Sequence, residues 1–184
     1  VSWNFPRLAD LPLAGFLLVN YRGYGDSQGK PSAAALAADA AFILDELVRR
    51  EGLAPDQVVL MGRSLGSGVA VDLASRRPAA GLILVTPFDR LSTIASHHYP
   101  LLPVRMLLRH EMDSIGRAPG IAAPALVVLA EQDRTVPPPY GRRLHEALAG
   151  PTELVTITGA DHNDLDGHRE YWRAIERFLA RVSR

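Results

Sequence analysis

The sequence predicts an α/β fold, in which a mostly parallel sheet carries helices on both faces. Short apolar runs alternate along the chain with longer stretches whose apolar residues recur at helical spacing. The short runs are nearly continuous in apolar character, which is typical of strands that are covered on both sides. With 184 residues, the chain is long enough to bury a sizeable core as one domain over residues 1–184.

The first half of the chain is expected to hold two strands and two helices. The run GFLLVN at Gly15–Asn20 predicts the first strand, and the glycine-rich RGYGDSQG after it predicts a tight turn. Ala33–Arg50 begins with alanines and continues as FILDELVRR, which indicates a packed helix. The apolar Gln57–Met61 predicts the second strand, and the helical spacing of Leu65–Ser75 predicts the second helix.

The second half repeats the alternation. Three further apolar runs are predicted as strands: Gly81–Val85, Ala125–Leu129 and Glu153–Ile157. Helices are expected at Tyr140–Ala149 and at Arg169–Val182, because the apolar side chains of the latter form one stripe. Residues 89–124 are the longest irregular region and are expected to form a short cap segment above the sheet edge.

Composition excludes several classes of function. The net charge is +0 with scattered basic residues, which argues against a nucleic-acid partner. The absence of cysteine excludes disulfides, cysteine zinc sites and a cysteine nucleophile, and the six histidines show no H-E-x-x-H pattern. We therefore expect no cofactor and no metal. No apolar run is long enough to cross a membrane, and a cytoplasmic location is expected.

The segment GRSLG places Ser64 between Gly62 and Gly66, at the junction of a predicted strand and a predicted helix. A nucleophile elbow requires this context, because a sharp turn there lifts the hydroxyl above the sheet edge and glycines allow close backbone approach. The start of the following helix would aim the N–H of Leu65 at negative charge on a substrate oxygen. Ser64 is therefore the candidate nucleophile, and Leu65 a candidate backbone oxyanion donor.

A dinucleotide-binding turn is the main rival, because Gly62, Gly66 and Gly68 have the spacing G-x-x-x-G-x-G found in short-chain dehydrogenases. Those enzymes also need a Tyr-x-x-x-Lys pair. The chain has one lysine, Lys30, and Asp26 stands four residues before it. A P-loop is excluded as well, because no Gly-Lys-Ser/Thr follows a strand.

A serine nucleophile needs an acid and a histidine downstream, each on a loop after a strand. Asp133 follows Ala125–Leu129 in AEQDRTVP, and His162 follows Glu153–Ile157 in TGADHNDL. Taken alone, Asp133 could be a turn acid and His162 could cap a loop. Taken together, three residue types in the required order at strand-end loops indicate a catalytic triad.

Five segments carry a resemblance to a known family: NYRGYGDSQGKPS, GRSLGSGVAVDLA, TPFDRLSTIASHHYPLLPV, LAEQDRTVPPPYGRRL and TGADHNDL. On the basis of these segments, nearly the whole chain resembles the α/β-hydrolase superfamily. Within the superfamily it resembles the BEM46-like group, which includes the α/β-hydrolase domain-containing 13 and 17 types of serine hydrolase. The resemblance implies the α/β-hydrolase fold, a triad of Ser64, Asp133 and His162, and an oxyanion donor at the backbone of Leu65.

The chain departs from the family pattern at its start. Family members carry a His-Gly-x segment that supplies the second oxyanion N–H, and this segment is absent here. The five predicted strands correspond by motif to strands 4 to 8 of the family. We therefore expect Val1 not to be the natural start, and upstream residues to supply three strands and the His-Gly loop. One missing strand would lie between Gly15–Asn20 and Gln57–Met61.

These residues predict a serine hydrolase that acts on a carboxylic ester, thioester or amide, with a small-molecule acyl compound or a peptide as substrate. Acyl transfer to another alcohol and peptidase action remain open, because they share the same acyl-enzyme. A catalytically silent hydrolase-like binding module is the alternative from another class, motivated by the absent His-Gly segment.

Several other residues are expected to be structural. Asp26 is interpreted as a turn acid, and His97 and His98 as exposed residues of the cap. Arg63 is expected to be solvated, with steering of an anionic substrate as the alternative. Six apolar cap residues are expected either to line a groove for an acyl chain or to pack onto the sheet: Tyr99, Leu101, Leu102, Val104, Met106 and Leu107.

Overall fold

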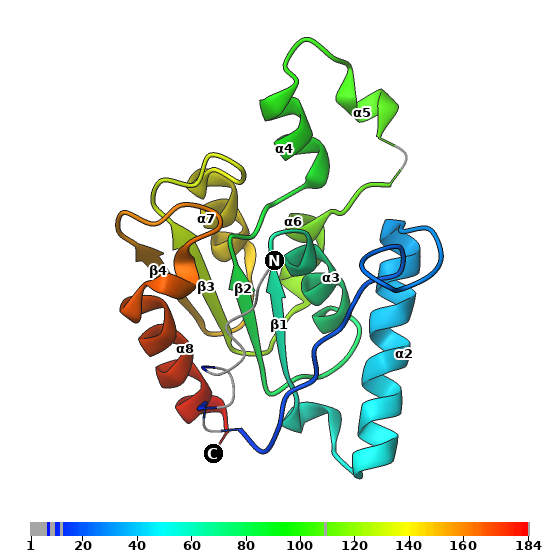
Figure 1. The fold of residues 1–184 in the computed structure, drawn as a ribbon, viewed down its shortest axis with the longest axis vertical. Coiled ribbons are helices and arrows are strands. Elements are labelled where there is room, and N and C mark those ends of the chain that lie inside the picture. The colour runs from blue at the N-terminus through cyan, green and yellow to red at the C-terminus, as the bar shows by residue number, and fades with distance from the viewer. Residues whose placement is uncertain (1–6, 8–9, 12, 109, 184) are drawn as a thin grey trace.

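The computed structural model describes residues 7, 10–11, 13–108 and 110–183. Within them, four strands form one parallel sheet in the order β1-β2-β3-β4 (Figure 1). The strands are β1 (Val59–Arg63), β2 (Gly81–Val85), β3 (Ala125–Ala130) and β4 (Thr152–Ile157). The helices are α2 (Ala33–Glu51), α3 (Leu65–Ala74), α4 (Leu91–His98), α5 (Val104–Leu107), α6 (Ser114–Arg117), α7 (Pro138–Ala147) and α8 (Arg169–Val182), with 3-10 turns at Pro55–Gln57, Ala118–Gly120 and Leu165–Gly167. The predicted α/β class is confirmed.

Both faces of the sheet are covered, which explains why its strands are apolar throughout. Successive residues of a strand point to opposite faces. In β2, Ile83 and Val85 face a core shared with α8, whereas Leu82 and Leu84 face a core shared with α2, α3 and α7. All four side chains are buried. A strand with one solvated face would have alternated with polar residues instead.

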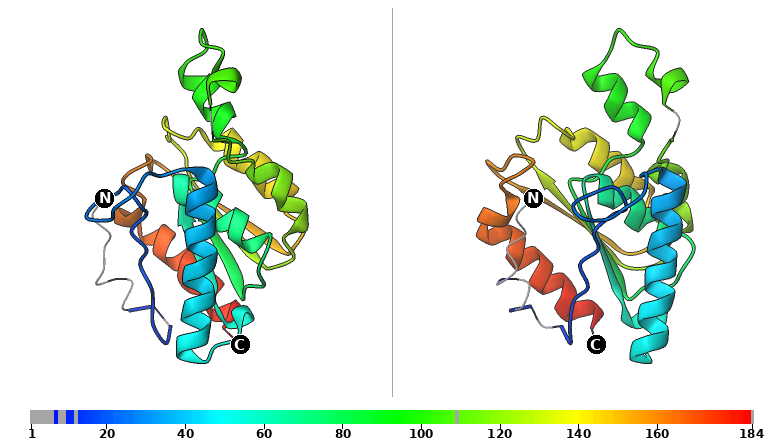
Figure 2. Two further views of the ribbon diagram at one scale, coloured as in Figure 1. Left: turned by 90° about the vertical axis from the view of Figure 1, so that its right-hand side faces the viewer. Right: turned by 45° about the vertical axis from the view of Figure 1, so that its right-hand side comes forward.

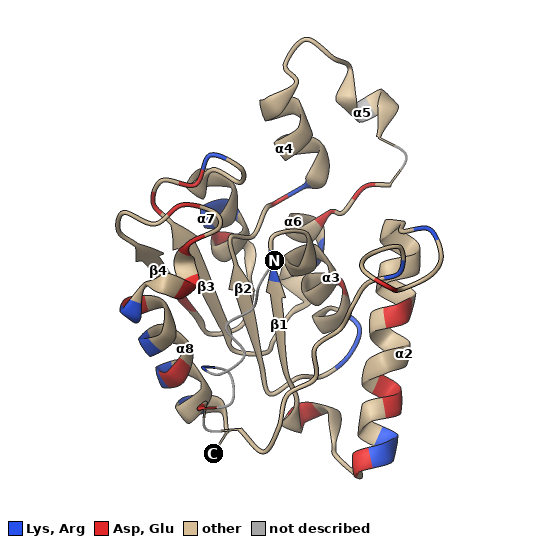
Figure 3. Ribbon diagram, in the orientation of Figure 1, with Lys and Arg blue, Asp and Glu red and all other residues tan. Residues whose placement is uncertain are grey.

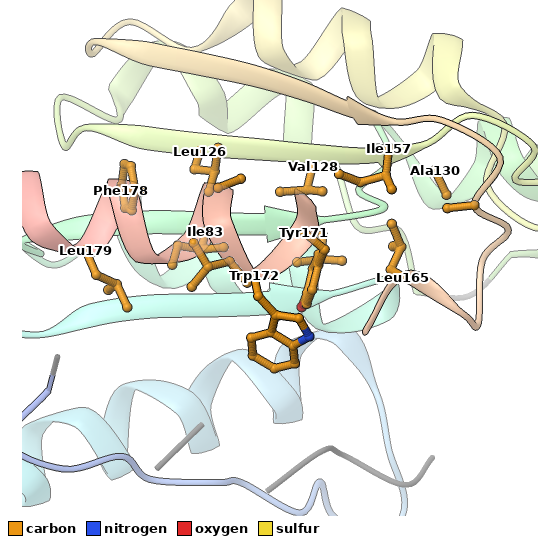
Figure 4. Close-up of a cluster of buried hydrophobic side chains, with 14 of the residues drawn as sticks. Ile83, Leu126, Val128, Ala130, Ile157, Leu165, Tyr171, Trp172, Phe178 and Leu179 are labelled. Atoms are coloured by element: carbon orange, nitrogen blue, oxygen red, sulfur yellow. The ribbon is translucent and has the colours of Figure 1, made fainter. Parts of the chain in front are cut away.

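The apolar stripe predicted for the last helix packs on one face of the sheet. Figure 4 shows the side chains of α8 lying against those of β2 and β3. Phe178 and Leu179 are each 2% exposed, and the indole N–H of Trp172 donates to the Asp166 carbonyl at 2.7 Å. The stripe therefore closes the core on this side of the sheet.

Helix α2 begins and ends where its sequence provides caps. The Ser32 side chain accepts a hydrogen bond from the N–H of Ala35 at 3.1 Å, and Gly52 ends the helix in the left-handed conformation with φ 65°. Leu36 and Leu44 are its buried residues. Among the described helices, including α2, none combines the length and apolar character needed to cross a bilayer.

The strand predicted at Gly15–Asn20 is wrong: this segment has no strand conformation and does not pair with β1. Its apolar side chains are exposed, from 41% for Leu18 to 54% for Leu17. An extended run becomes a strand only when a neighbouring strand accepts and donates its backbone hydrogen bonds. No such neighbour lies beside it within the described residues, so the sheet has four strands rather than five. The expectation of further strands upstream stays a prediction.

Candidate active site

Ser64 lies on a sharp turn between β1 and α3, as predicted. Its backbone has φ 51° and ψ −120°, and positive φ is uncommon for a residue with a side chain. The N–H of Ser64 donates to the carbonyl of Val85 at 2.9 Å, which ties the turn to the end of β2. The strand–turn–helix context of a nucleophile elbow is therefore present in the fold.

The two flanking glycines serve different purposes. A Cβ on Gly62 would lie 2.2 Å from the carbonyl oxygen of Gly66, so no side chain fits there without moving the backbone of α3. A Cβ on Gly66 would lie 3.1 Å from the hydroxyl oxygen of Tyr21, a side-chain atom that has more freedom to move. The predicted close backbone approach therefore accounts for Gly62 more strongly than for Gly66.

The structure brings Ser64, Asp133 and His162 together at the carboxyl ends of three strands. Ser64 follows β1, Asp133 lies in the loop after β3, and His162 lies in the loop after β4. The Nε2 atom of His162 lies 3.1 Å from the Oγ atom of Ser64, and its Nδ1 atom lies 2.7 Å from Oδ2 of Asp133. A continuous line of hydrogen bonds thus joins the carboxylate to the serine hydroxyl.

The Asp133 carboxylate is held in place from both sides. Its Oδ1 atom accepts hydrogen bonds from the backbone N–H of Thr135 at 2.9 Å and of Val136 at 2.8 Å. The Asp133 side chain is 1% exposed and the His162 side chain 10%. Asp133 is therefore a turn residue and a partner of His162 at once, and burial protects the contact from competition by water.

The loop that carries His162 is also held by a contact that the sequence did not predict. The Arg63 guanidinium, one residue before Ser64, donates through Nη2 to the backbone carbonyl of His162 at 2.5 Å. The N–H of His162 donates to Oδ1 of Asp161 at 2.6 Å. Arg63 is half-buried, so the expectation that it would be solvated is wrong. No local pattern reveals a contact between residues 99 positions apart.

The predicted oxyanion donor, Leu65, is the first residue of α3. An N–H in the first turn of a helix has no acceptor within that helix and lies at the positive end of the helix dipole. The carbonyl of Ser64 accepts from the N–H of Ser67 at 2.9 Å and from its hydroxyl at 2.6 Å, which fixes this first turn. The role of the Leu65 N–H as an oxyanion donor stays a prediction.

A second strained residue lies beside Ser64. Thr86 follows β2, and because Arg63 pairs with Val85, Thr86 stands next to Ser64 in the sheet register. Thr86 has φ 46°, its exposure is 1%, and its hydroxyl has no hydrogen-bond partner within the described residues. No sequence signal marked this position, since a β-branched residue is not expected at positive φ.

Two family models match the chain: the alpha/beta hydrolase family over residues 1–119, and TAP-like proteins over residues 106–183. The uncharacterized protein Rv2307c of Mycobacterium tuberculosis is 42% identical over 91% of this chain and 60% of its own length. The alpha/beta hydrolase domain-containing protein 17B of Xenopus laevis is 30% identical over 88% of this chain and 54% of its own length. The chain thus spans little more than half the length of these relatives.

The fold agrees with these matches. A monoacylglycerol lipase of Paleococcus ferrophilus superposes with a TM-score of 0.65 and 21% identity, over 89% of this chain and 82% of that one. Such an identity shows a shared fold alone. The family match over residues 1–119 shows that this chain belongs to the α/β-hydrolase family, and the relatives' identities show that it is similar to the domain-containing 17 type.

Proposed function

We propose that the chain is a serine hydrolase that cleaves a carboxylic ester, thioester or amide through an acyl-enzyme on Ser64. The observation that supports this most is the line of hydrogen bonds from Asp133 through His162 to Ser64. Its members lie on three separate loops, and each is buried or half-buried. A chance meeting of these three residue types would not be expected to place both nitrogens of one imidazole at hydrogen-bond distance.

In the proposed reaction, Nε2 of His162 removes the proton of Ser64 as Oγ bonds to the acyl carbon. The carbonyl oxygen becomes an oxyanion, which the N–H of Leu65 stabilises. The intermediate then expels the alcohol, thiol or amine, which takes the proton from His162. Water repeats these steps on the acyl-enzyme and releases the acid. Throughout, Asp133 holds the His162 proton on Nδ1 and stabilises the charged imidazolium.

A fluorophosphonate probe tests this proposal directly, because it phosphonylates only an activated serine. We expect the folded chain to gain one adduct, mapped by mass spectrometry to the peptide that contains Ser64, and the urea-unfolded chain to gain none. A folded chain that remained unlabelled would contradict the proposal and favour the silent binding module. For a labelled chain, rates on p-nitrophenyl esters of increasing acyl length and on aminopeptidase substrates would separate ester from peptide cleavage.

Arg63 should act as a positioning residue, since it bonds to the His162 backbone rather than to a reacting atom. We expect Arg63→Met to lower kcat by about ten- to a hundredfold with little change in KM. Without the Arg63 contact the His162 loop shifts, and Nε2 of His162 is then no longer aligned with the Ser64 hydroxyl. Arg63→Lys should recover part of this loss. The matched control is Arg49→Met, which removes an exposed α2 arginine paired with Glu46. A raised KM with unchanged kcat would instead place Arg63 in substrate binding.

A further inference from the structure

Helices α4 and α5 form a segment that stands out from the body of the molecule, and all three views agree on this (Figures 1 and 2). The segment comprises residues 91–107. It leaves the sheet after β2, at the same strand-end edge that carries Ser64. The segment is held to the body at its base by the ion pair of Arg90 with Asp113 at 2.9 Å, and at the far end of α4 by the contact of His98 Nε2 with the Thr135 carbonyl at 2.8 Å. Helix α4 is therefore held at both ends, while the tip that follows it projects into solvent.

The tip is apolar and exposed. Five large apolar side chains within nine residues lie mostly in solvent: Tyr99 (60%), Leu101 (96%), Leu102 (54%), Met106 (86%) and Leu107 (62%). Val104 is buried, at 8% exposure. The five exposed side chains therefore meet neither sequence expectation, because they do not pack onto the sheet and side chains this exposed do not enclose a groove. Single exposed apolar residues are ordinary, but a contiguous set marks a site of interaction.

The charge of the segment has one sign. Residues 91–107 contain no Asp or Glu and one basic residue, Arg105, whereas Arg90 just before them is already paired with Asp113. In Figure 3 the acidic residues lie on the connections that lead to and from the segment, not on α4 or α5. A partner that offers both an apolar interior and a negative surface matches this combination. A bilayer with anionic lipids is such a partner.

The shape of the tip also favours a bilayer over a folded protein. The exposed side chains lie on a narrow projection, which can enter the boundary between headgroups and acyl chains without a complementary cavity on the other side. Pro100 and Pro103 flank Leu101 and Leu102 and restrict the backbone of the turn. Such restriction lowers the conformational entropy that is lost when the tip is immobilised.

We propose that the α4–α5 segment docks on anionic lipid bilayers by inserting the five exposed apolar side chains of its tip. Docking would turn the strand-end edge with Ser64, Asp133 and His162 toward the membrane surface. The binding itself does not depend on the proposed hydrolase activity. The Ser64→Ala variant should therefore bind vesicles as the unaltered chain does, which separates a failure of this proposal from a failure of the proposed function.

Cosedimentation with vesicles tests the proposal. We expect the chain to bind phosphatidylcholine vesicles that contain phosphatidylglycerol about fivefold or more tightly than vesicles of phosphatidylcholine alone. Leu101→Asp combined with Met106→Asp should lower the partition coefficient by about tenfold or more. The control is Phe42→Asp, which places the same charge at an apolar residue of α2 that is 69% exposed. Circular dichroism checks that every variant is folded.

A second measurement avoids any loss of apolar surface. The chain has no cysteine, so Leu101→Cys and Phe42→Cys each provide a unique thiol for an environment-sensitive dye. We expect a blue shift with anionic vesicles at position 101 and none at position 42. The proposal is overturned by the absence of vesicle binding, by equal shifts at both positions, or by Asp variants that bind as tightly as the control. It is also overturned if the tip variants abolish a dimer seen by sedimentation while vesicle binding is unchanged.

Discussion

Replacement of Ser64 by alanine is expected to lower kcat for acyl-ester hydrolysis by about a millionfold. Loss of the nucleophile removes the acyl-enzyme, and in triad enzymes loss of the serine alone removes nearly all the catalysis that the triad provides. The residual rate would come from the Leu65 N–H and from substrate binding. The measurement is the steady-state rate on a p-nitrophenyl ester, with the unfolding temperature as a check on folding.

Ser75→Ala is the matched control for this substitution. Ser75 lies at the end of α3, and its hydroxyl donates to the carbonyl of Asp72 at 2.8 Å, far along the helix from the elbow. Its rate should equal that of the unaltered chain. If Ser64→Ala retained the ester hydrolysis of the unaltered chain, the observed activity would arise at another site, and Ser64 would not be the nucleophile.

The Asp133→Asn variant is expected to lose about ten thousandfold in kcat while its fold is kept. The carboxylate accepts a hydrogen bond from His162 Nδ1 at 2.7 Å, and this bond keeps the proton away from Nε2. An amide can donate instead, which stabilises the other tautomer, and Nε2 then carries a proton and cannot accept the one from Ser64. The variant thus separates the chemical role of Asp133 from its size.

Asp26→Asn is the control for the charge change. Asp26 is an exposed residue of the turn after Tyr21, and its replacement should leave the rate unchanged. Backbone N–H groups of Thr135 and Val136 also bond to Asp133, so the unfolding temperature of Asp133→Asn must be measured alongside its rate. A variant that is folded and fully active would show that His162 does not need this carboxylate.

The buried strands and their helices could be predicted because their signals are local. Gly81–Val85 is apolar at every position and is flanked by turn residues, and its predicted bounds are those of β2. Arg169–Val182 is likewise predicted at its observed bounds, since one stripe of large apolar residues requires a helix that covers a core. Tyr140–Ala149 begins two residues late, because Pro138 and Pro139 form the first turn of α7.

The strand prediction at Gly15–Asn20 is wrong because strand formation there depends on a non-local interaction. Its sequence has the apolar, extended character of a strand, and on this criterion it cannot be told apart from β2. Whether it pairs depends on a neighbouring strand, and pairing is a property of the whole sheet rather than of the segment. The prediction of the candidate triad does not depend on Gly15–Asn20. It depends only on the order of serine, acid and histidine in three loops, and each of these loops follows a strand that does form.

By itself, the sequence determined the fold class, the elbow at Ser64 and the identity of the two residues expected to assist it. Each follows from local patterning or from chain order, because parallel strands bring their carboxyl ends to one edge whatever their exact packing. The tertiary structure alone decided that Arg63 reaches the His162 carbonyl, that Thr86 stands strained beside Ser64, and that the tip of α4–α5 projects into solvent. These features depend on where distant segments lie relative to one another, and the spacing of residues along a chain does not contain that information.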